Sequence, residues 1–340
     1  MGWSGSLTTS SALGSNITFT PDTSTIGAYT VSSFTAPRKG VYRFQLKGSG
    51  GANGPALWEN RNLMWNSDGG VGGFTDGYLL LEKGQTVYIG AGGPCSAAFV
   101  SGVSGSKLAD IAKANLHFVA GGGGQGGTIG ESYNNTGYNC IAGLGGDGGG
   151  SSGAQGGYDS KGGTGGTQSA GGASKGEDSA FTLGGSGTYG VGGSGSHSWS
   201  GPYEALGGRG GDGYYGGGSG GCFSRGDTKP YTARGMGGGG GSGYVKTETL
   251  TVRDNTYTST TSQSGGAESN NNGSVVVTYF ARVELPIIFN GTQLERLIFN
   301  GTEIDSLIFN GTTLFIERIK RRLIEWSTLT RMVRRSRIPI

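Results

Sequence analysis

Few of the 340 residues have the types and spacing of a catalytic or metal-binding site. The two histidines, His117 and His197, have no cysteine pair nearby and belong to no H-E-x-x-H motif, so zinc binding and Cys–His catalysis are poorly supported. Carboxylates such as Asp147, Glu177 and Asp178 show no recognisable acid–base pairing. We therefore expect no catalytic residue, no metal and no cofactor. A glycan depolymerase stays open as an alternative, because its carboxylates can converge from distant segments.

Two short motifs could bind ligands. G-x-G-x-x-G occurs at residues 185–190 and 211–216, but it indicates a dinucleotide site only between a strand and a helix. Neither copy precedes a helical pattern, and glycine is so frequent here that the motif carries little information. Arg225-Gly226-Asp227 matches an integrin-binding tripeptide, yet residues 209–212 nearly repeat it in the same glycine-rich context. Neither motif predicts a function.

The aromatic residues of the glycine-rich region are more informative. Tyrosine and tryptophan on loops held by a rigid scaffold are typical of recognition surfaces. The candidate receptor-binding residues are Trp199, Tyr203, Tyr214, Tyr215 and Phe223. Any one of them could instead cap the glycine-rich region as an apolar plug. A second candidate set, Trp58 and Trp65, is expected on loops of the flanking β domain.

The elements that must position these aromatic residues are unusual, because 76 residues are glycine and 50 of those lie in residues 121–243. Eight prolines and the lack of a continuous Gly-X-Y run exclude collagen. The 10% of aromatic residues and the net charge of +3 are untypical of a disordered chain. Three widely spaced cysteines do not predict a disulfide framework. We therefore expect a packed structure built on glycine.

Glycine recurs at every third position within this region, as in residues 121–130, 184–193 and 207–216. A period of three is typical of a left-handed extended helix with three residues per turn, which has no internal hydrogen bonds. Its backbone groups must bond to neighbouring rods, and only glycine lets the backbones approach closely enough. The pattern predicts a bundle of rods over residues 121–243 that is ordered without being α-helical or β.

Short apolar or alternating segments on both sides of this region predict β-strands. They lie at residues 41–46, 78–81, 86–89, 116–119, 244–245, 249–252 and 274–280. Strands that flank an insertion in this way suggest a β-sandwich. We expect residues 1–38 to form an N-terminal segment with β-strands.

Residues 39–283 resemble the glycine-rich domain of phage tail fibre and receptor-binding proteins, and are also similar to the glycine-rich region of anaplastic lymphoma kinase. The resemblance lies in V-Y-R-F-Q-L-K-G-S-G-G at 41–51 and in residues 73–93, 118–124, 237–245 and 273–279. It implies a mainly β fold, a jelly-roll-like sandwich with an inserted polyglycine II helix bundle. It also implies that loops at the bundle tip contact a receptor on the host surface. A kinase domain is not part of this sequence.

Residues 284–316 contain a different repeat. I-I-F-N-G-T at 287–292 returns as L-I-F-N-G-T at 297–302 and 307–312, with a period of ten. Asn-Gly between apolar runs predicts a tight β-hairpin, and three small hairpins cannot bury their apolar side chains alone. We expect them to pack against sister chains in a homotrimer or against a partner. The assembly residues would be Phe289, Ile298, Phe299, Ile308 and Phe309. Similar Asn-Gly-Thr repeats occur in phage tail proteins.

The last segment, residues 317–340, is basic, with eight Lys and Arg residues against two glutamates. Apolar residues at helical spacing predict an amphipathic helix over 317–335. This helix could bind nucleic acid or a membrane surface. We favour docking to a partner or to the chain's own trimer, because no phosphate-binding fold accompanies it.

These features together predict a non-enzymatic structural and receptor-binding protein of a phage tail. Its expected partners are two further copies of the chain, other tail or baseplate proteins and a host receptor, glycan or protein; nucleic acid is disfavoured. The polar, uncharged residues 1–16 do not predict a Sec-type signal peptide, in keeping with location in the virion tail. The main alternative is an extracellular adhesin or matrix-type structural protein of a cellular organism.

Overall fold

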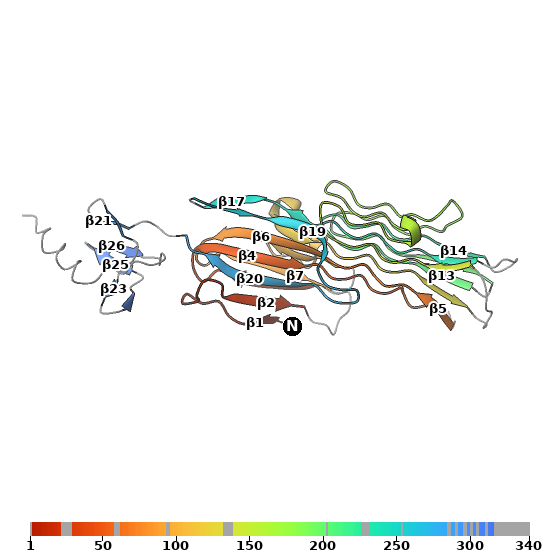
Figure 1. Ribbon diagram of the computed structural model, residues 1–340, viewed down its shortest axis with the longest axis horizontal. Coiled ribbons are helices and arrows are strands. Elements are labelled where there is room, and N and C mark those ends of the chain that lie inside the picture. The colour runs from red at the N-terminus through yellow and green to blue at the C-terminus, as the bar shows by residue number, and fades with distance from the viewer. Residues whose placement is uncertain are drawn as a thin grey trace, which may run out of the picture.

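The computed structural model is mainly β. The helices among the residues that it describes are all short 3-10 helices. Those residues are 2–21, 29–57, 62–92, 96–131, 139–201, 203–225, 232–252, 254–283 and the hairpin strands between 287 and 315. A pair of sheets and a glycine-rich region lie end to end (Figure 1).

Two antiparallel sheets pack face to face in the first part. The larger sheet contains, in spatial order, β1 (Gly2–Ser4), β2 (Asn16–Thr20), β20 (Ser274–Ala281), β4 (Gly40–Lys47), β6 (Gly73–Leu81) and β19 (Thr260–Gly265). The smaller sheet contains β16 (Tyr244–Val245), β9 (Leu116–Ala120), β8 (Ala98–Ser101), β7 (Thr86–Ala91) and β3 (Thr30–Thr35). β2 pairs with β20 and β3 pairs with β7, so strands from the first 38 residues belong to the same two sheets.

The core between these sheets follows from the alternation of side chains along each strand. In β4, Tyr42, Phe44 and Leu46 are buried, whereas Arg43 and Gln45 between them are partly exposed. The strands predicted from alternation and from apolar runs are confirmed. A hairpin and a long loop lie outside the two sheets. The hairpin consists of β17 (Thr249–Val252) and β18 (Asn255–Thr258), and the loop that follows β8 carries η1 (Leu108–Asp110) and η2 (Lys113–Asn115).

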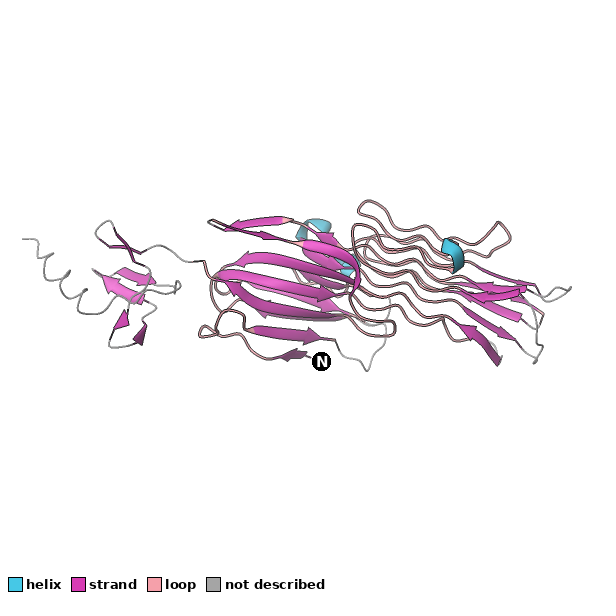
Figure 2. Cartoon of the chain, in the orientation of Figure 1, coloured by secondary structure: helices cyan, strands magenta, loops and turns pink. Residues whose placement is uncertain are grey.

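The glycine-rich segments run side by side between the two-sheet part and a second group of strands (Figure 2). The central segment is residues 235–243. Hydrogen bonds join it to one neighbour at every third residue: Gly143 N–H to Gly235 O (2.8 Å), Gly146 N–H to Gly238 O (2.9 Å) and Gly149 N–H to Gly241 O (2.8 Å). Six segments share hydrogen bonds with it, namely residues 121–127, 143–149, 153–156, 163–166, 207–213 and 216–221. The prediction that backbone groups bond to neighbouring segments is confirmed.

At the glycines that face a neighbouring segment, the spacing leaves no room for a side chain. A Cβ atom added to Gly238 would lie 2.1 Å from the carbonyl oxygen of Arg209, and one added to Gly210 would lie 2.0 Å from that of Gly217. Contacts this short do not occur at real Cβ atoms, so glycine is required at these positions. We call the assembly of glycine segments the bundle.

The bundle extends beyond the predicted range of 121–243. Residues 48–54 and 67–73 also belong to it and again bond at every third residue: Gly48 N–H to Gly73 O (2.8 Å), Gly51 N–H to Gly70 O (2.8 Å) and Gly54 N–H to Ser67 O (3.0 Å). Their shorter glycine rows were not recognised in the sequence. The prediction that 121–243 lacks β structure was wrong, because this range contains strands.

These strands form two small sheets at the end of the bundle remote from the larger sheets (Figure 1). One contains β12 (Ser196–Ser200), β13 (Tyr203–Gly207), β10 (Thr128–Glu131) and β5 (Asn62–Asn66), in spatial order. The other contains β11 (Asn139–Ala142), β15 (Thr232–Gly235) and β14 (Cys222–Arg225), with β11 and β15 parallel. Ile129, Tyr203, Ala205, Cys222 and Ala233 form a buried cluster here. We call these two sheets the tip; the short η3 (Tyr158–Ser160) lies in the bundle.

The predicted hairpin pairings in residues 284–316 are present. β21 (Ile287–Phe289) pairs with β22 (Thr292–Leu294), β23 (Ile298–Phe299) with β24 (Thr302–Glu303), and β25 (Ser306–Phe309) with β26 (Thr312–Phe315). The predicted assembly residues Phe289, Ile298, Phe299, Ile308 and Phe309 lie on β21, β23 and β25. The predicted helix at 317–335 lies outside the described residues.

Candidate recognition surface

The five aromatic residues predicted to bind a receptor do not form one cluster. Trp199, Tyr203 and Phe223 lie in the tip, on β12, β13 and β14. Tyr214 and Tyr215 lie at the other end of the bundle, where they contact Lys113 in η2. The reason is the direction of the chain. Residues 207–213 run from β13 in the tip back to the two larger sheets, and the local sequence does not show which end a reversal occupies.

Within the tip, the three aromatic residues differ in exposure. The Trp199 side chain is 61% exposed, and its indole N–H donates to the carbonyl oxygen of Gly201 at 2.9 Å. Tyr203 is only 1% exposed and belongs to the tip core. Phe223 is half-buried, with its ring centroid 5.8 Å from that of Phe181. Trp199 is therefore the best placed of the three for contact with another molecule. Tyr203 instead packs in the core of the tip.

Trp65 is a further exposed aromatic residue of the tip. It is 47% exposed and lies on β5, an edge strand of the four-stranded sheet whose other edge strand, β12, carries Trp199. The expectation that Trp65 belongs to a loop of the flanking β domain was wrong. The apolar run Leu63-Met64-Trp65 between two asparagines was a strand signal that could have found β5. Trp58, the other member of that candidate set, lies outside the described residues.

Charged side chains at the tip end of the bundle are held by partners. Glu177 accepts a hydrogen bond from Lys161, at 2.9 Å, and forms an ion pair with Arg234. Glu204 is fully buried, with an oxygen 3.2 Å from Nε2 of His197. Buried or half-buried pairs of this kind fix side-chain geometry more than they add stability. The tip thus offers exposed indole rings beside oriented polar groups, a combination that suits a glycan or a protein surface.

A buried carboxylate connects the bundle to the smaller of the two large sheets. Asp212 is 5% exposed and accepts hydrogen bonds from the Tyr29 hydroxyl, at 2.6 Å, and from the Gly192 amide, at 2.7 Å. The Arg209 guanidinium lies 3.6 Å away. Burial raises the pKa of Asp212, and the guanidinium and the hydrogen bonds oppose that shift only in part. Burial also raises the pKa of Tyr29 well above its ordinary value.

The described residues offer little for catalysis. No group of three or more His, Cys, Asp or Glu side chains among them could hold a metal ion. Burial raises the pKa of the Cys140 thiol, and that of the Cys222 thiol to about 11, so both thiols are protonated at neutral pH. Within the described residues, no helix has the length and apolar character needed to cross a membrane.

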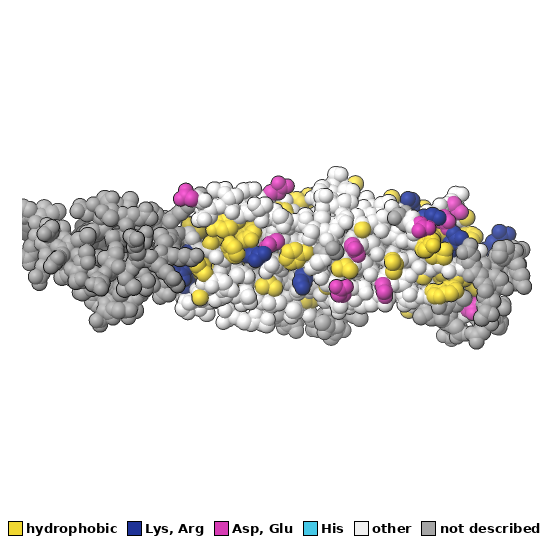
Figure 3. Space-filling view, viewed as in Figure 1, with side chains coloured by type: hydrophobic (Ala, Val, Ile, Leu, Met, Phe, Trp, Pro, Cys, Tyr) yellow, Lys and Arg dark blue, Asp and Glu magenta, His cyan; other side chains and the backbone are white. Residues whose placement is uncertain are grey.

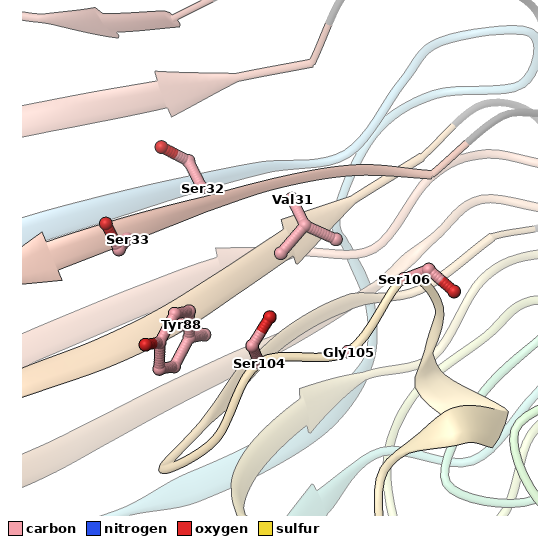
Figure 4. A pocket seen from close by; sticks show the side chains of 7 residues that line it. All are labelled: Val31, Ser32, Ser33, Tyr88, Ser104, Gly105 and Ser106. Carbon is pink, nitrogen blue, oxygen red and sulfur yellow. The ribbon is translucent and has the colours of Figure 1, made fainter.

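A shallow pocket lies beside β3 and β7 of the five-stranded sheet (Figure 4). Its lining consists of Val31, Ser32, Ser33, Tyr88, Ser104, Gly105 and Ser106. This lining contains hydroxyl groups but no carboxylate, imidazole or thiol that could activate them for nucleophilic attack. The pocket therefore supports weak polar contacts and no obvious chemistry.

Charged side chains are sparse along the bundle on the face in Figure 3, and several of them gather at the tip end. This distribution agrees with a bundle whose segments are joined by backbone hydrogen bonds rather than by charged side chains. No known family model matches the chain, and a search of curated proteins finds no match to it.

Proposed function

We propose that this chain is a non-enzymatic structural and receptor-binding protein of a phage tail. In this proposal the two large sheets are a jelly-roll-like domain, and the glycine segments are polyglycine II helices that carry the tip to the host surface. Trp199 and Trp65 then make the first contacts with a cell-surface receptor, a glycan or a protein.

The observation that carries this proposal is the surroundings of residues 235–243. Six neighbouring segments share backbone hydrogen bonds with that segment, and those to residues 143–149 recur at every third residue. Six neighbours and a three-residue repeat of hydrogen bonds support the proposal of polyglycine II helices, in which three residues complete one turn. Such a bundle loses much backbone entropy on folding. Its advantage is a thin, stiff support for the small sheets at its end.

The hairpin repeats supply an assembly function within the same proposal. Residues 284–316 would pack against the same residues of two other chains and attach the trimer to other tail or baseplate proteins. Three tips in one particle would add avidity, so that weak individual contacts are sufficient for attachment. The basic residues 317–340 would serve as the docking segment.

The experiment that tests this proposal is immunoelectron microscopy with antibody raised against the purified chain. Antibody should label the tail of phage particles produced by cells that carry the gene. Label on the envelope of cells that produce no particles would overturn the proposal and favour the alternative, an adhesin or matrix-type protein of a cellular organism.

A further inference from the structure

Three tyrosine rings at the inner end of the bundle stand nearly at right angles to one another. Tyr189, Tyr214 and Tyr215 form interplanar angles of 90°, 75° and 87°, with ring centroids 5.4–6.1 Å apart. Lys113 of η2 places its ammonium nitrogen among them. The nitrogen lies 4.3 Å from the centroid of Tyr215, 4.9 Å from that of Tyr189 and 5.8 Å from that of Tyr214. We call these three rings the cage.

The walls of the cage are fixed by contacts that do not involve Lys113. The Tyr189 hydroxyl donates to the Ile111 carbonyl at 2.6 Å, and the Tyr214 ring stacks on Tyr244 at 4.1 Å and 12°. The backbone amides of Tyr214 and Tyr215 both bond to Ser242, at 2.9 and 3.1 Å. Removal of the lysine side chain would therefore leave the three rings in place.

Among the described residues, only the rings and one hydroxyl group hold the ammonium of Lys113. Its side chain is exposed, and its one hydrogen bond to a described residue goes to the Tyr215 hydroxyl. None of the described carboxylates forms an ion pair with it. A lysine ammonium is strongly hydrated and loses part of that hydration among aromatic rings. An alkylated ammonium is less hydrated and binds such rings better, as aromatic cages for choline and methyl-lysine illustrate.

We propose that the cage is a binding site for quaternary or alkylated ammonium groups, and that Lys113 is an internal occupant which such a ligand displaces. The ligand class is defined by charge and shape, as in a choline-bearing or N-methylated molecule. The cage lies at the opposite end of the bundle from the tip, so this inference does not depend on the proposed function. Competition from Lys113 lowers the apparent affinity, because only the fraction of molecules with an open cage binds.

Titration of the full-length chain with choline chloride, followed by NMR or calorimetry, tests this proposal. Lys113→Ala should bind choline at least fivefold more tightly than the wild type. Lys246→Ala is the matched control, because Lys246 donates to the Ala114 carbonyl in the same loop but contacts none of the cage rings. This variant should bind choline as the wild type does. The neutral isostere of choline, 3,3-dimethyl-1-butanol, should bind to none of these three proteins.

Tyr215→Ala in the Lys113→Ala background should abolish binding. Circular dichroism melting must show that this double variant is folded, and Tyr215→Phe, which keeps the ring, should restore binding. Two results would overturn the proposal. One is no choline binding by folded Lys113→Ala, which would leave Lys113 as a structural contact between η2 and the bundle. The other is equal binding of choline and its neutral isostere, which would indicate apolar adsorption.

Discussion

At the scale of single residues, the bundle depends on the absence of Cβ atoms. Gly238→Val would place a side chain against the carbonyl oxygen of Arg209, where a Cβ alone would lie at 2.1 Å. The neighbouring segments must separate, and buried backbone groups then lose their partners. We expect the free energy of unfolding to fall by about 3 kcal/mol or more. Urea denaturation of the purified protein measures this loss.

The control for this prediction is Ala173→Val. The Ala173 carbonyl accepts a hydrogen bond from Thr164 of the bundle, at 3.0 Å, and the residue is exposed. Its unfolding free energy should change by less than about 0.5 kcal/mol, as at an ordinary surface position. Similar losses in both variants would show that valine disfavours this backbone conformation generally and that close packing is not the cause.

Asp212 gives a pH dependence whose sign follows from its raised pKa. Because burial makes the folded state hold the Asp212 proton more tightly than the unfolded chain does, this group stabilises the fold below its ordinary pKa. The contribution is lost as the pH rises through the raised pKa. The stability advantage of the wild type over Asp212→Asn should therefore be largest near pH 4 and smaller by about pH 7.

Thermal melting of both proteins across this pH range checks the prediction. An advantage that grows toward neutral pH would mean that the donors around Asp212, Tyr29 and Gly192, outweigh burial and hold its pKa low. Tyr29→Phe should reduce stability at every pH in this range, because the Tyr29 hydroxyl remains protonated throughout.

At the scale of elements, the alternation of apolar residues and the spacing of glycines predicted strands and glycine segments better than the aromatic residues predicted the candidate site. β4 and β20 were recognisable because each is long and has one buried face. The glycine segments were recognisable because glycine recurs in them at every third position. The tip strands were missed because each has only four or five residues, rich in small side chains. The packing partners of such strands are distant in sequence, so local propensity could not reveal them.

The candidate site was predicted only in part, for a related reason. Burial of Tyr203 and exposure of Trp199 depend on how their strands lie in the tip sheet. β13 pairs with β10, which is distant in the chain, and β12 is an edge strand. The position of Tyr214 depends on the direction of the glycine segment before it. Both are properties of the assembled bundle, and a sequence period does not contain them.

The hairpin repeats give a prediction at the same scale. Because Asn-Gly supplies the positive φ angles of a tight turn, Asn300→Val combined with Gly301→Val should open the middle hairpin and weaken assembly. Light scattering of the full chain should give about three times its mass of 34.5 kDa. The double variant should shift toward the monomer, whereas Glu303→Gln should not. A wild type of monomer mass would contradict the assembly role.

At the scale of the whole molecule, the described chain has hydrophobic cores at two ends of a backbone-bonded middle. The large sheets bury an aromatic core around Phe44 and Phe118, and the tip buries a smaller one around Tyr203. Backbone hydrogen bonds join the segments of the bundle between them. This arrangement presents exposed groups such as Trp199 away from the large sheets.

We propose that the tip contacts the host, and binding of fluorescently labelled protein to host cells tests this contact most directly. Trp199→Ala should reduce cell binding at least tenfold while the melting temperature and oligomer mass stay unchanged. Leu144→Ala provides the matched control, because Leu144 is 59% exposed but lies in the bundle outside the tip sheets. This control should bind as the wild type does. Full binding by Trp199→Ala combined with Trp65→Ala, in a protein with unchanged melting temperature and mass, would contradict the claim.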